Sequence, residues 1–416
     1  MRRDHDEKPS PTLDRYRDNM LIEACGAILS PTEIAKGLIH LPPRPSPNDL
    51  ALPAHVLAHA PQALRSMHIP TAAGLALAQS IDIMIRQGYV DRNPTAATTW
   101  QRIYDVPRFA NPNAMVAPGA TVVGPSGTGK SSAIQRALNL KPQLVVHERF
   151  PHLVGPVRQL IWLKIDVPSS GSLKDLVRAF AHAADQVLGT DYEDRLGKGR
   201  DSADSMARRW LTLIGSHFLG LLVLDELQNL FKIETKAARR ERPADRGRPL
   251  LRIKDDDALK FILTVMNGSR IPVLACSTPD GIQAIGTRTA ALQRLVTNGR
   301  HYIAHAATPD DEFFRKMFFP HLIGYQWLPE RLPDTPEVRS TFHRLSGGIA
   351  RIGVTLWAQS NQRAIMRGAR GLTLEDLHFT GLDTLAPLQP AIQALLSEDP
   401  NRLMLYEDLL PRAAGV

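Results

Sequence analysis

A glycine-rich segment, TVVGPSGTGKSSAIQ from Thr121 to Gln135, carries the clearest chemical signal in the chain. An apolar stretch precedes the spacing G-x-x-x-x-G-K-S and a helical pattern follows it, which is the context that a phosphate-binding loop requires. The glycines let backbone N–H groups surround phosphate oxygens, and the N-terminus of the following helix adds its dipole. We expect Lys130 to reach the β and γ phosphates of a nucleotide and Ser131 to ligate Mg²⁺. The residues predicted to surround the nucleotide are Gly124, Pro125, Ser126, Gly127, Thr128, Gly129, Lys130, Ser131 and Ser132.

Two adjacent carboxylates, Asp225 and Glu226, end the apolar run LLVLDE. A buried strand would deliver both side chains at its carboxyl end, beside the phosphate loop. Asp225 would then hold the metal through its water shell, and Glu226 would orient or deprotonate the attacking water. The alternative is an ordinary acidic strand end, but the phosphate loop upstream favours the catalytic interpretation.

A second polar strand end, in IPVLACSTPDG, contains Ser277 and Thr278. A hydroxyl group at this position can sense the γ-phosphate and position the water between that phosphate and Glu226. We predict that Thr278, rather than Ser277, has this role. The alternative is that these hydroxyl groups only cap the loop that follows.

Three arginines further along the chain are candidates for stabilising phosphate charge. Arg294 and Arg300 lie in LQRLVTNGRHYIA, and an arginine from such a place reaches the γ-phosphate of a neighbouring subunit in ATPases that form rings or filaments. The sequence does not distinguish between the two. Arg351, in LSGGIARIGVTLW, lies near the start of a helix and off its apolar face, where a lid could close onto the nucleotide. For all three, the alternative is a solvated surface arginine.

Short apolar runs alternate with helical patterns between Met115 and about His305, and these elements must position the residues above. The runs LVV, LIWLKI, LLVLDE and IPVLACS are nearly continuous, as expected of parallel strands covered on both faces. They predict an α/β nucleotide-binding domain with a parallel sheet flanked by helices. The predicted organisation is an N-terminal helical extension over 1–110, the ATPase core over 111–305, a small all-helical lid over 306–385 and a C-terminal tail over 386–416.

The composition limits the class of partner and the location of the protein. A net charge of +8 favours a polyanionic partner, with nucleic acid the leading candidate. The two cysteines, Cys25 and Cys276, form neither a disulfide pattern nor a metal-ligand spacing. No apolar run approaches the roughly 18 residues that span a bilayer, and the first residues lack the apolar core of a secretion signal. We therefore expect a cytoplasmic protein with no membrane partner.

The order of five elements resembles that of the AAA+ ATPases: phosphate loop, DE strand, polar strand end, arginine, and a helical lid with an arginine. The resemblance implies an AAA+ P-loop fold, with ATP and Mg²⁺ as cofactors and hydrolysis of ATP to ADP and phosphate. Such proteins usually work as assemblies because their composite site spans two subunits. A homo-oligomer, either a ring or a helical filament, is therefore expected.

A more specific resemblance lies between the phosphate loop and the DE strand. The segment RQLIWLKIDVPSSGSLKDLVRAFAHAADQVLGTDY, followed by GLLVLDELQNL, resembles TnsC and its TniB relatives, the AAA+ regulators of transposons that move with a multi-subunit transposase. IRQGYVDRNP at 85–94 and ARGLTLEDL at 369–377 are similar to the same family, so the resemblance covers roughly residues 35 to 410.

The resemblance to TnsC implies a cycle and a set of partners. Members of that family polymerise with ATP on double-stranded DNA, receive a signal from a target-selector protein of the TniQ or TnsD kind, and recruit and activate the transposase. The same cycle is implied here. Because Glu226 is present, hydrolysis and disassembly are implied as well.

The family resemblance also points to the residues that would grip the DNA backbone, namely Lys174, Lys198 and Arg200. Backbone contacts make binding largely independent of DNA sequence and sensitive to salt. A second basic stretch, 231–254, holds nine lysines and arginines against three acids, a local charge of +6. It is either a further DNA contact or a solvated surface.

The tail carries Leu388, Ile392, Leu395 and Leu396 at helical spacing. These side chains either pack on the lid or dock as an amphipathic segment on a transposase subunit, as family tails do.

Two other functions would share the ATP motifs: a helicase loader or replication-initiator ATPase, and a scaffold NTPase that does not touch DNA. The segment WLKIDVPSSGSLKDL, together with the N-terminal motif, favours the transposition regulator over the loader.

Overall fold

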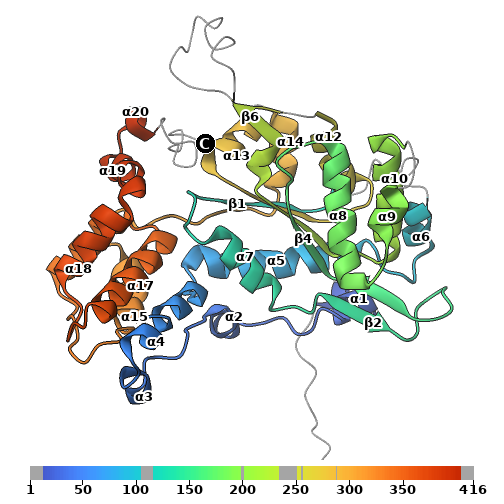
Figure 1. Ribbon diagram of the computed structural model, residues 1–416. Helices are drawn as coiled ribbons and strands as arrows, with labels where there is room; N and C mark the ends of the chain where they lie inside the picture. The colour runs from blue at the N-terminus through green and yellow to red at the C-terminus, as the bar shows by residue number, and fades with distance from the viewer. Residues whose placement is uncertain are drawn as a thin grey trace, which may run out of the picture.

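The computed structural model describes residues 13–104, 116–197, 201–233, 251–253, 256–286 and 288–403 (Figure 1). An α/β core lies beside a helical unit formed by the C-terminal part of the chain, and N-terminal helices reach both (Figure 1). Within the described ranges, no helix combines the length and the apolar character needed to cross a membrane.

A five-stranded sheet with the order β4-β5-β8-β1-β9 forms the centre of the core. Its strands are β1 Gly119–Val123, β4 Trp162–Asp166, β5 Leu221–Asp225, β8 Val273–Ser277 and β9 Arg300–Tyr302. All neighbouring strands are parallel. Every residue of β1, β5 and β8 is buried, which explains why these strands appear in the sequence as continuous apolar runs. Because parallel strands end at a common edge, the phosphate loop, the DE pair and Ser277 meet there.

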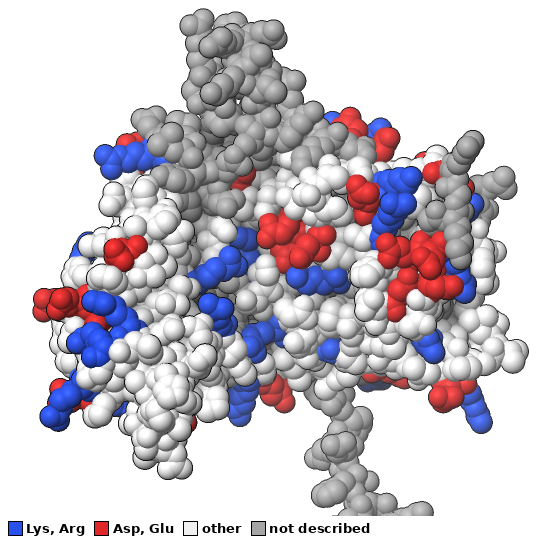
Figure 2. Space-filling model, viewed as in Figure 1, with Lys and Arg blue, Asp and Glu red and all other residues white. Residues whose placement is uncertain are grey.

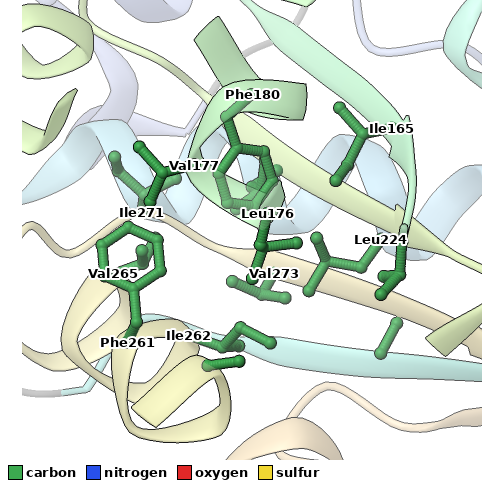
Figure 3. Packing of buried hydrophobic residues seen from close by; sticks show 14 of the residues in the cluster. Ile165, Leu176, Val177, Phe180, Leu224, Phe261, Ile262, Val265, Ile271 and Val273 are labelled. Atoms are coloured by element: carbon green, nitrogen blue, oxygen red, sulfur yellow. The ribbon is translucent and has the colours of Figure 1, made fainter. Parts of the chain in front are cut away.

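Helices cover both faces of this sheet. In the core they are α7 Lys130–Leu138, α8 Leu173–Leu188, α9 Tyr192–Gly197, α10 Ala203–Ser216, α12 Asp256–Asn267, α13 Pro279–Gly286 and α14 Thr289–Leu295, with the short 3-10 helix η3 Leu227–Leu230. Figure 3 shows Phe180 of α8 and Phe261 of α12 in the same buried cluster as Leu224 of β5 and Val273 of β8, and the ring centroids of the two phenylalanines are 6.2 Å apart. This packing holds β5 and β8 in place, and the ends of these strands carry candidate site residues.

One predicted strand does not belong to the main sheet. We expected the run LVV to form a parallel strand covered on both faces, and this was wrong. In the structure, β2 Leu144–His147 pairs antiparallel with β3 Val157–Leu160 as a separate two-stranded sheet. Val146 is 49% exposed, and the connecting loop exposes Val154 completely. A short apolar run looks the same in the sequence whether it forms a buried strand or a projecting hairpin. The run does not show which other elements pack against its faces.

The N-terminal helices pack on the sheet and on the lid. They are α1 Met20–Glu23, α2 Pro31–Leu38, α3 Pro47–Leu50, α4 Ala54–Leu57, α5 Ala72–Val90 and α6 Ala97–Tyr104, with the 3-10 helices η1 Asp14–Tyr16 and η2 Ala60–Ser66. Apolar residues of α5 share a cluster with the inner strands. Just after α5, the Arg92 guanidinium donates to the main-chain oxygen of Leu219 at 2.6 Å. The N-terminal motif IRQGYVDRNP therefore joins this helix to the start of β5.

The C-terminal helices form a second core of their own. They are α15 Phe319–Ile323, α16 Pro336–Ser346, α17 Ala350–Met366, α18 Leu374–Phe379, α19 Gln389–Ser397 and α20 Pro400–Leu403, with short turns at η4 Phe314–Phe318, η5 Thr380–Thr384 and η6 Ala386–Leu388. Phe342 lies at the centre, with its ring 5.1 Å from that of Phe319 and 6.0 Å from that of Trp357. Leu57 and Leu64 from the N-terminal helices complete the cluster. The division of the chain at 110, 305 and 385 stays a prediction.

The described part of the tail, which ends at residue 403, packs on the lid. Ile392 and Leu395 are buried, and the Ile392 side chain lies beside Gly347 of the lid. Leu396 is half-buried, whereas Leu388 is 40% exposed. The part of the predicted tail from residue 404 to 416 lies outside the described residues, and docking on a transposase subunit stays a prediction.

Candidate nucleotide-binding site

The phosphate loop between β1 and α7 is shaped by its glycines. Gly127 and Gly129 have φ values of 80° and 97°, in the left-handed region that residues with side chains rarely adopt. A Cβ atom on Gly124 would lie 2.1 Å from the main-chain oxygen of Ile303, so the close approach of the chain after β9 requires glycine. The Lys130 ammonium donates to the main-chain oxygens of Gly124 and Pro125, at 2.8 and 2.9 Å. The main-chain oxygens of the phosphate loop thus bind the ammonium group of the loop's own lysine.

The remaining residues of the phosphate loop differ in burial and in hydrogen bonding. Thr128 is buried and its hydroxyl donates to the main-chain oxygen of Pro125 at 2.9 Å. Ser126 is half-buried, and Ser132 is exposed at the start of α7.

A cavity of about 440 Å³ opens beside the loop. Its walls come from the loop and α7, from the segment 65–71 and from the lid. The residues that line it from the segment 65–71 are Arg65, Met67, His68, Ile69 and Thr71. Burial, followed by the charge of Arg136, lowers the pKa of His68 to about 4, so its imidazole is neutral near pH 7 and Arg65 is the charged side chain of this wall. A cavity of this size, with an apolar wall and backbone donors at one end, suits the base and sugar of a nucleotide.

The lid touches the phosphate loop directly at Arg351. The main-chain N–H of Arg351 donates to the main-chain oxygen of Gly127 at 3.0 Å. The glycine pair before α17 permits this approach. Gly348 has a φ of 65°, and a Cβ atom there would lie 2.1 Å from the main-chain oxygen of Ala306. The Arg351 side chain is exposed and lines the cavity, at the start of α17 where the sequence placed a lid arginine.

Asp225 is a buried carboxylate at the end of β5, with a side chain only 3% exposed. Burial acts to raise its pKa, but hydrogen bonds from Cys276, Ser131 and Lys164, together with the Lys164 charge, hold the pKa below its usual value. The hydroxyl of Ser131 and the carboxylate of Asp225 are thus adjacent. These are the hard oxygen donors that Mg²⁺ prefers, and Mg²⁺ keeps several waters as its other ligands. The residues present therefore fit the predicted metal.

Lys164 is a neighbour of Asp225 that the sequence analysis missed. It lies on β4, and its ammonium is 3.0 Å from Asp225 Oδ2 and 3.4 Å from Asp166 Oδ1. Alternation along a strand places Lys164 and Asp166 on one face. The charge pattern K-x-D in LKID was the available signal, but only the strand order β4-β5 connects it with Asp225.

Glu226 has a strained backbone and a side-chain partner. Its φ of 56° lies in the left-handed region, which for a residue other than glycine is a feature found at functional sites. The Gln228 side-chain amide donates to the Glu226 carboxylate. The Gln228 oxygen in turn accepts from the Ser277 hydroxyl and the Thr278 main-chain N–H, both at 3.3 Å. Gln228, which the sequence analysis also missed, therefore connects the two strand ends.

Thr278 is 3% exposed, and its hydroxyl has no hydrogen-bond partner among the described residues. The Ser277 hydroxyl instead donates a hydrogen bond to the side-chain oxygen of Gln228. An unpaired buried hydroxyl at the common edge of the sheet is available to a phosphate or a water, which supports the choice of Thr278.

We predict that Gln228→Ala lowers ATP turnover about tenfold and leaves the Kd for ATP unchanged, because the amide holds the carboxylate of Glu226, which is predicted to act on the attacking water and not to bind the nucleotide. Steady-state phosphate release and equilibrium binding would measure the two quantities. The exposed Gln79 on α5 provides the control variant Gln79→Ala. Equal turnover in Gln228→Ala and the unsubstituted protein would remove Gln228 from this role.

The two arginines predicted to act on a neighbouring subunit lie on the side of the edge strand β9. Arg300 begins β9, is exposed and pairs in register with Thr121. Arg294 is half-buried in the last turn of α14, and its main-chain oxygen would lie 2.4 Å from a Cβ atom on Gly119, at the start of β1. Arg294 therefore lies beside the start of β1 and Arg300 beside its middle residue, whereas the phosphate loop follows its end. Their role on a neighbouring subunit stays a prediction.

Of the predicted DNA contacts, Lys174 is exposed in the first turn of α8. Lys198 and Arg200 lie outside the described residues. The basic stretch is described only at its base, where β6 Phe231–Ile233 and β7 Leu251–Ile253 form an antiparallel ladder. On the face shown in Figure 2, the described basic and acidic side chains are interspersed and form no continuous basic surface.

Comparisons with known proteins agree with this fold. Residues 117–285 match the family model of an AAA domain. No curated protein sequence matches the chain. Among solved structures, the ORC1 protein of Aeropyrum pernix in complex with DNA has 15% identity and a TM-score of 0.43, with 70% of this chain and 67% of that chain covered.

Two further structures give similar values. The ORC2 protein of Aeropyrum pernix, in ADPNP–ADP complexes, has 11% identity and a TM-score of 0.40 over 70% of this chain and 69% of that chain. Drosophila ORC bound to DNA has 12% identity and a TM-score of 0.37 over 74% of this chain and 66% of that chain. At these identities and TM-scores, the likeness carries no information about the partners of this chain.

The sheet order, the flanking helices, the phosphate loop and the matched family model define an AAA+ domain with helical regions on both sides of it in the sequence. This confirms the fold class predicted from the motifs.

Proposed function

We propose that the chain is an ATP-dependent, DNA-binding AAA+ regulator of transposition. In this proposal it assembles on double-stranded target DNA, links a target-selector protein to the transposase, and hydrolyses ATP to disassemble. The ATPase part rests on one observation: the phosphate loop and Arg351 of the lid border one nucleotide-sized cavity, and Ser131 at the end of that loop is hydrogen-bonded to the buried Asp225.

Each residue would have a separate role in hydrolysis. Lys130 would exchange its two carbonyl partners for the β and γ phosphates. Glu226 would orient or deprotonate the attacking water, and Thr278 would place its free hydroxyl near the γ-phosphate. Ser131 and Asp225 would hold Mg²⁺, which supplies charge neutralisation to the phosphates when bound.

Assembly would complete the site in trans. An arginine on the β9 side of one subunit, Arg294 or Arg300, would stabilise phosphate charge in the adjacent subunit. A ring or a helical filament places such an edge against a neighbour at every interface, because both are built from head-to-tail contacts.

The DNA and transposition parts rest on the sequence resemblance to TnsC and TniB. It runs through α5, β4, α8 and β5 and so covers more than the ATP motifs. Lys174, Lys198 and Arg200 would contact the phosphate backbone, and the +8 charge suits such a partner. Transposase subunits and a selector of the TniQ or TnsD kind would be the protein partners.

The test is negative-stain imaging of the full chain with a non-hydrolysable ATP analogue, with and without a duplex of random sequence. We expect rings or helical assemblies around the duplex only when both ligands are present. Affinity measured over a series of salt concentrations should fall steeply, and a second duplex of unrelated sequence should bind equally well. Assemblies that form equally without DNA, or no affinity for DNA at any salt concentration, would favour the scaffold NTPase instead.

A helicase loader or replication-initiator ATPase is the second candidate, because it would share every ATP motif. The two functions differ in their protein partner. Stimulation of strand transfer by a purified transposase would support the regulator, and delivery of a replicative helicase to DNA would support the loader.

A further inference from the structure

Asp225 and Lys164 form an ion pair beside the phosphate loop. Asp225 is a charged group that is almost fully removed from solvent, and a buried charge requires a partner. Lys164 meets this requirement, since its ammonium lies 3.0 Å from Asp225 Oδ2.

A second carboxylate is within reach of the same ammonium. Asp166 Oδ1 is 3.4 Å from Lys164 Nζ, and its side chain is 72% exposed. Asp166 is paired in register with Asp225, so the two carboxylates lie side by side at the ends of β4 and β5. A lysine has a flexible stem and rotatable donors, and it can exchange one carboxylate for the other without movement of the backbone.

We propose that Lys164 is a positioning residue of the nucleotide site that neutralises Asp225 until Mg²⁺ arrives and then transfers its ammonium to Asp166. This inference rests on the proposed binding of ATP and Mg²⁺. Lys164 thereby has two effects. It keeps Asp225 from repelling the phosphates of ATP when metal is absent, and it opposes metal binding at Asp225.

The test is equilibrium binding of ATP to the full chain, measured by titration calorimetry in EDTA and over a series of Mg²⁺ concentrations. Lys164→Met should bind ATP about tenfold more weakly in EDTA, because an uncompensated carboxylate then faces the phosphates. Its half-saturating Mg²⁺ concentration should fall about tenfold, because a competing positive charge is gone. An unchanged ratio of the Kd values with and without Mg²⁺ would overturn the proposal.

Lys141→Met is the matched control, since Lys141 is a lysine 2.6 Å from another carboxylate, Asp82, and is not among the proposed site residues. It should leave the Mg²⁺ dependence unchanged. Lys164→Arg keeps the charge and should behave like the unsubstituted protein.

Asp166→Asn provides an independent arm if Lys164→Met fails to fold. Loss of the second carboxylate should raise the half-saturating Mg²⁺ concentration about threefold, because Lys164 then has only Asp225 as a partner. In the double variant with Lys164→Met this effect should disappear, and an undiminished effect there would contradict the exchange. No binding of ATP by the unsubstituted protein would instead refute the proposed function, so the two failures are distinguishable.

Discussion

Lys130→Ala is expected to weaken ATP binding by more than about 100-fold and to abolish nucleotide-dependent assembly, because the ammonium is the cation proposed to bind the β and γ phosphates. The substitution removes two hydrogen bonds to loop carbonyls, but the Pro125 oxygen keeps its hydrogen bond from the Thr128 hydroxyl, so the fold should survive. Calorimetric titration with ATP would measure affinity, and imaging with a non-hydrolysable analogue would measure assembly.

The matched control for this variant is Lys260→Ala. Lys260 is 67% exposed on α12 and forms an ion pair with Asp257, which is equally exposed. Thermal unfolding without nucleotide should give the same Tm for both variants. Normal ATP-driven polymerisation of Lys130→Ala would refute the assignment of the phosphate loop.

Glu226→Gln should bind ATP with nearly unchanged affinity and hydrolyse it about 100-fold more slowly, because glutamine keeps the shape of the side chain but cannot accept a proton. Assemblies on DNA should persist correspondingly longer, since hydrolysis is the step that ends them. Phosphate release in single-turnover experiments would give the rate, and imaging at timed intervals would give the lifetime.

Glu148→Gln is the control variant for Glu226→Gln, because it also removes one carboxylate and Glu148 is exposed in the loop between β2 and β3. It should hydrolyse ATP at the normal rate. If Glu226→Gln hydrolyses ATP as fast as Glu148→Gln, another group must activate the water.

These two variants separate the two halves of the proposed cycle. Lys130→Ala should prevent assembly, and Glu226→Gln should prevent disassembly. A protein that uses nucleotide only as a scaffold ligand would lose assembly in the first case and show no change of lifetime in the second.

The sequence by itself determined the fold class and the ends of the main strands. A buried parallel strand must be apolar throughout, and the chemistry of phosphate binding constrains the residues that follow it, so both leave a local pattern. The phosphate loop and the runs ending at Asp225 and Ser277 are short segments of this kind. Their neighbours in sequence determine their structure.

Contacts between distant segments were decided only by the tertiary structure. In the sequence, Lys164 is one residue of an apolar run. Only the adjacency of β4 and β5 in the sheet brings its side chain to Asp225. The segment 65–71 has no motif, but it forms one wall of the nucleotide cavity. The hairpin at Leu144 was predicted incorrectly because its apolar residues resemble those of a buried strand.

The physical reason is the same in each case. A sequence pattern records what a segment requires of its surroundings, such as burial, a turn or a bound phosphate. It does not record which other segment supplies them. Strand order and helix packing make that choice, and in this chain they bring together the residues proposed to act on the nucleotide.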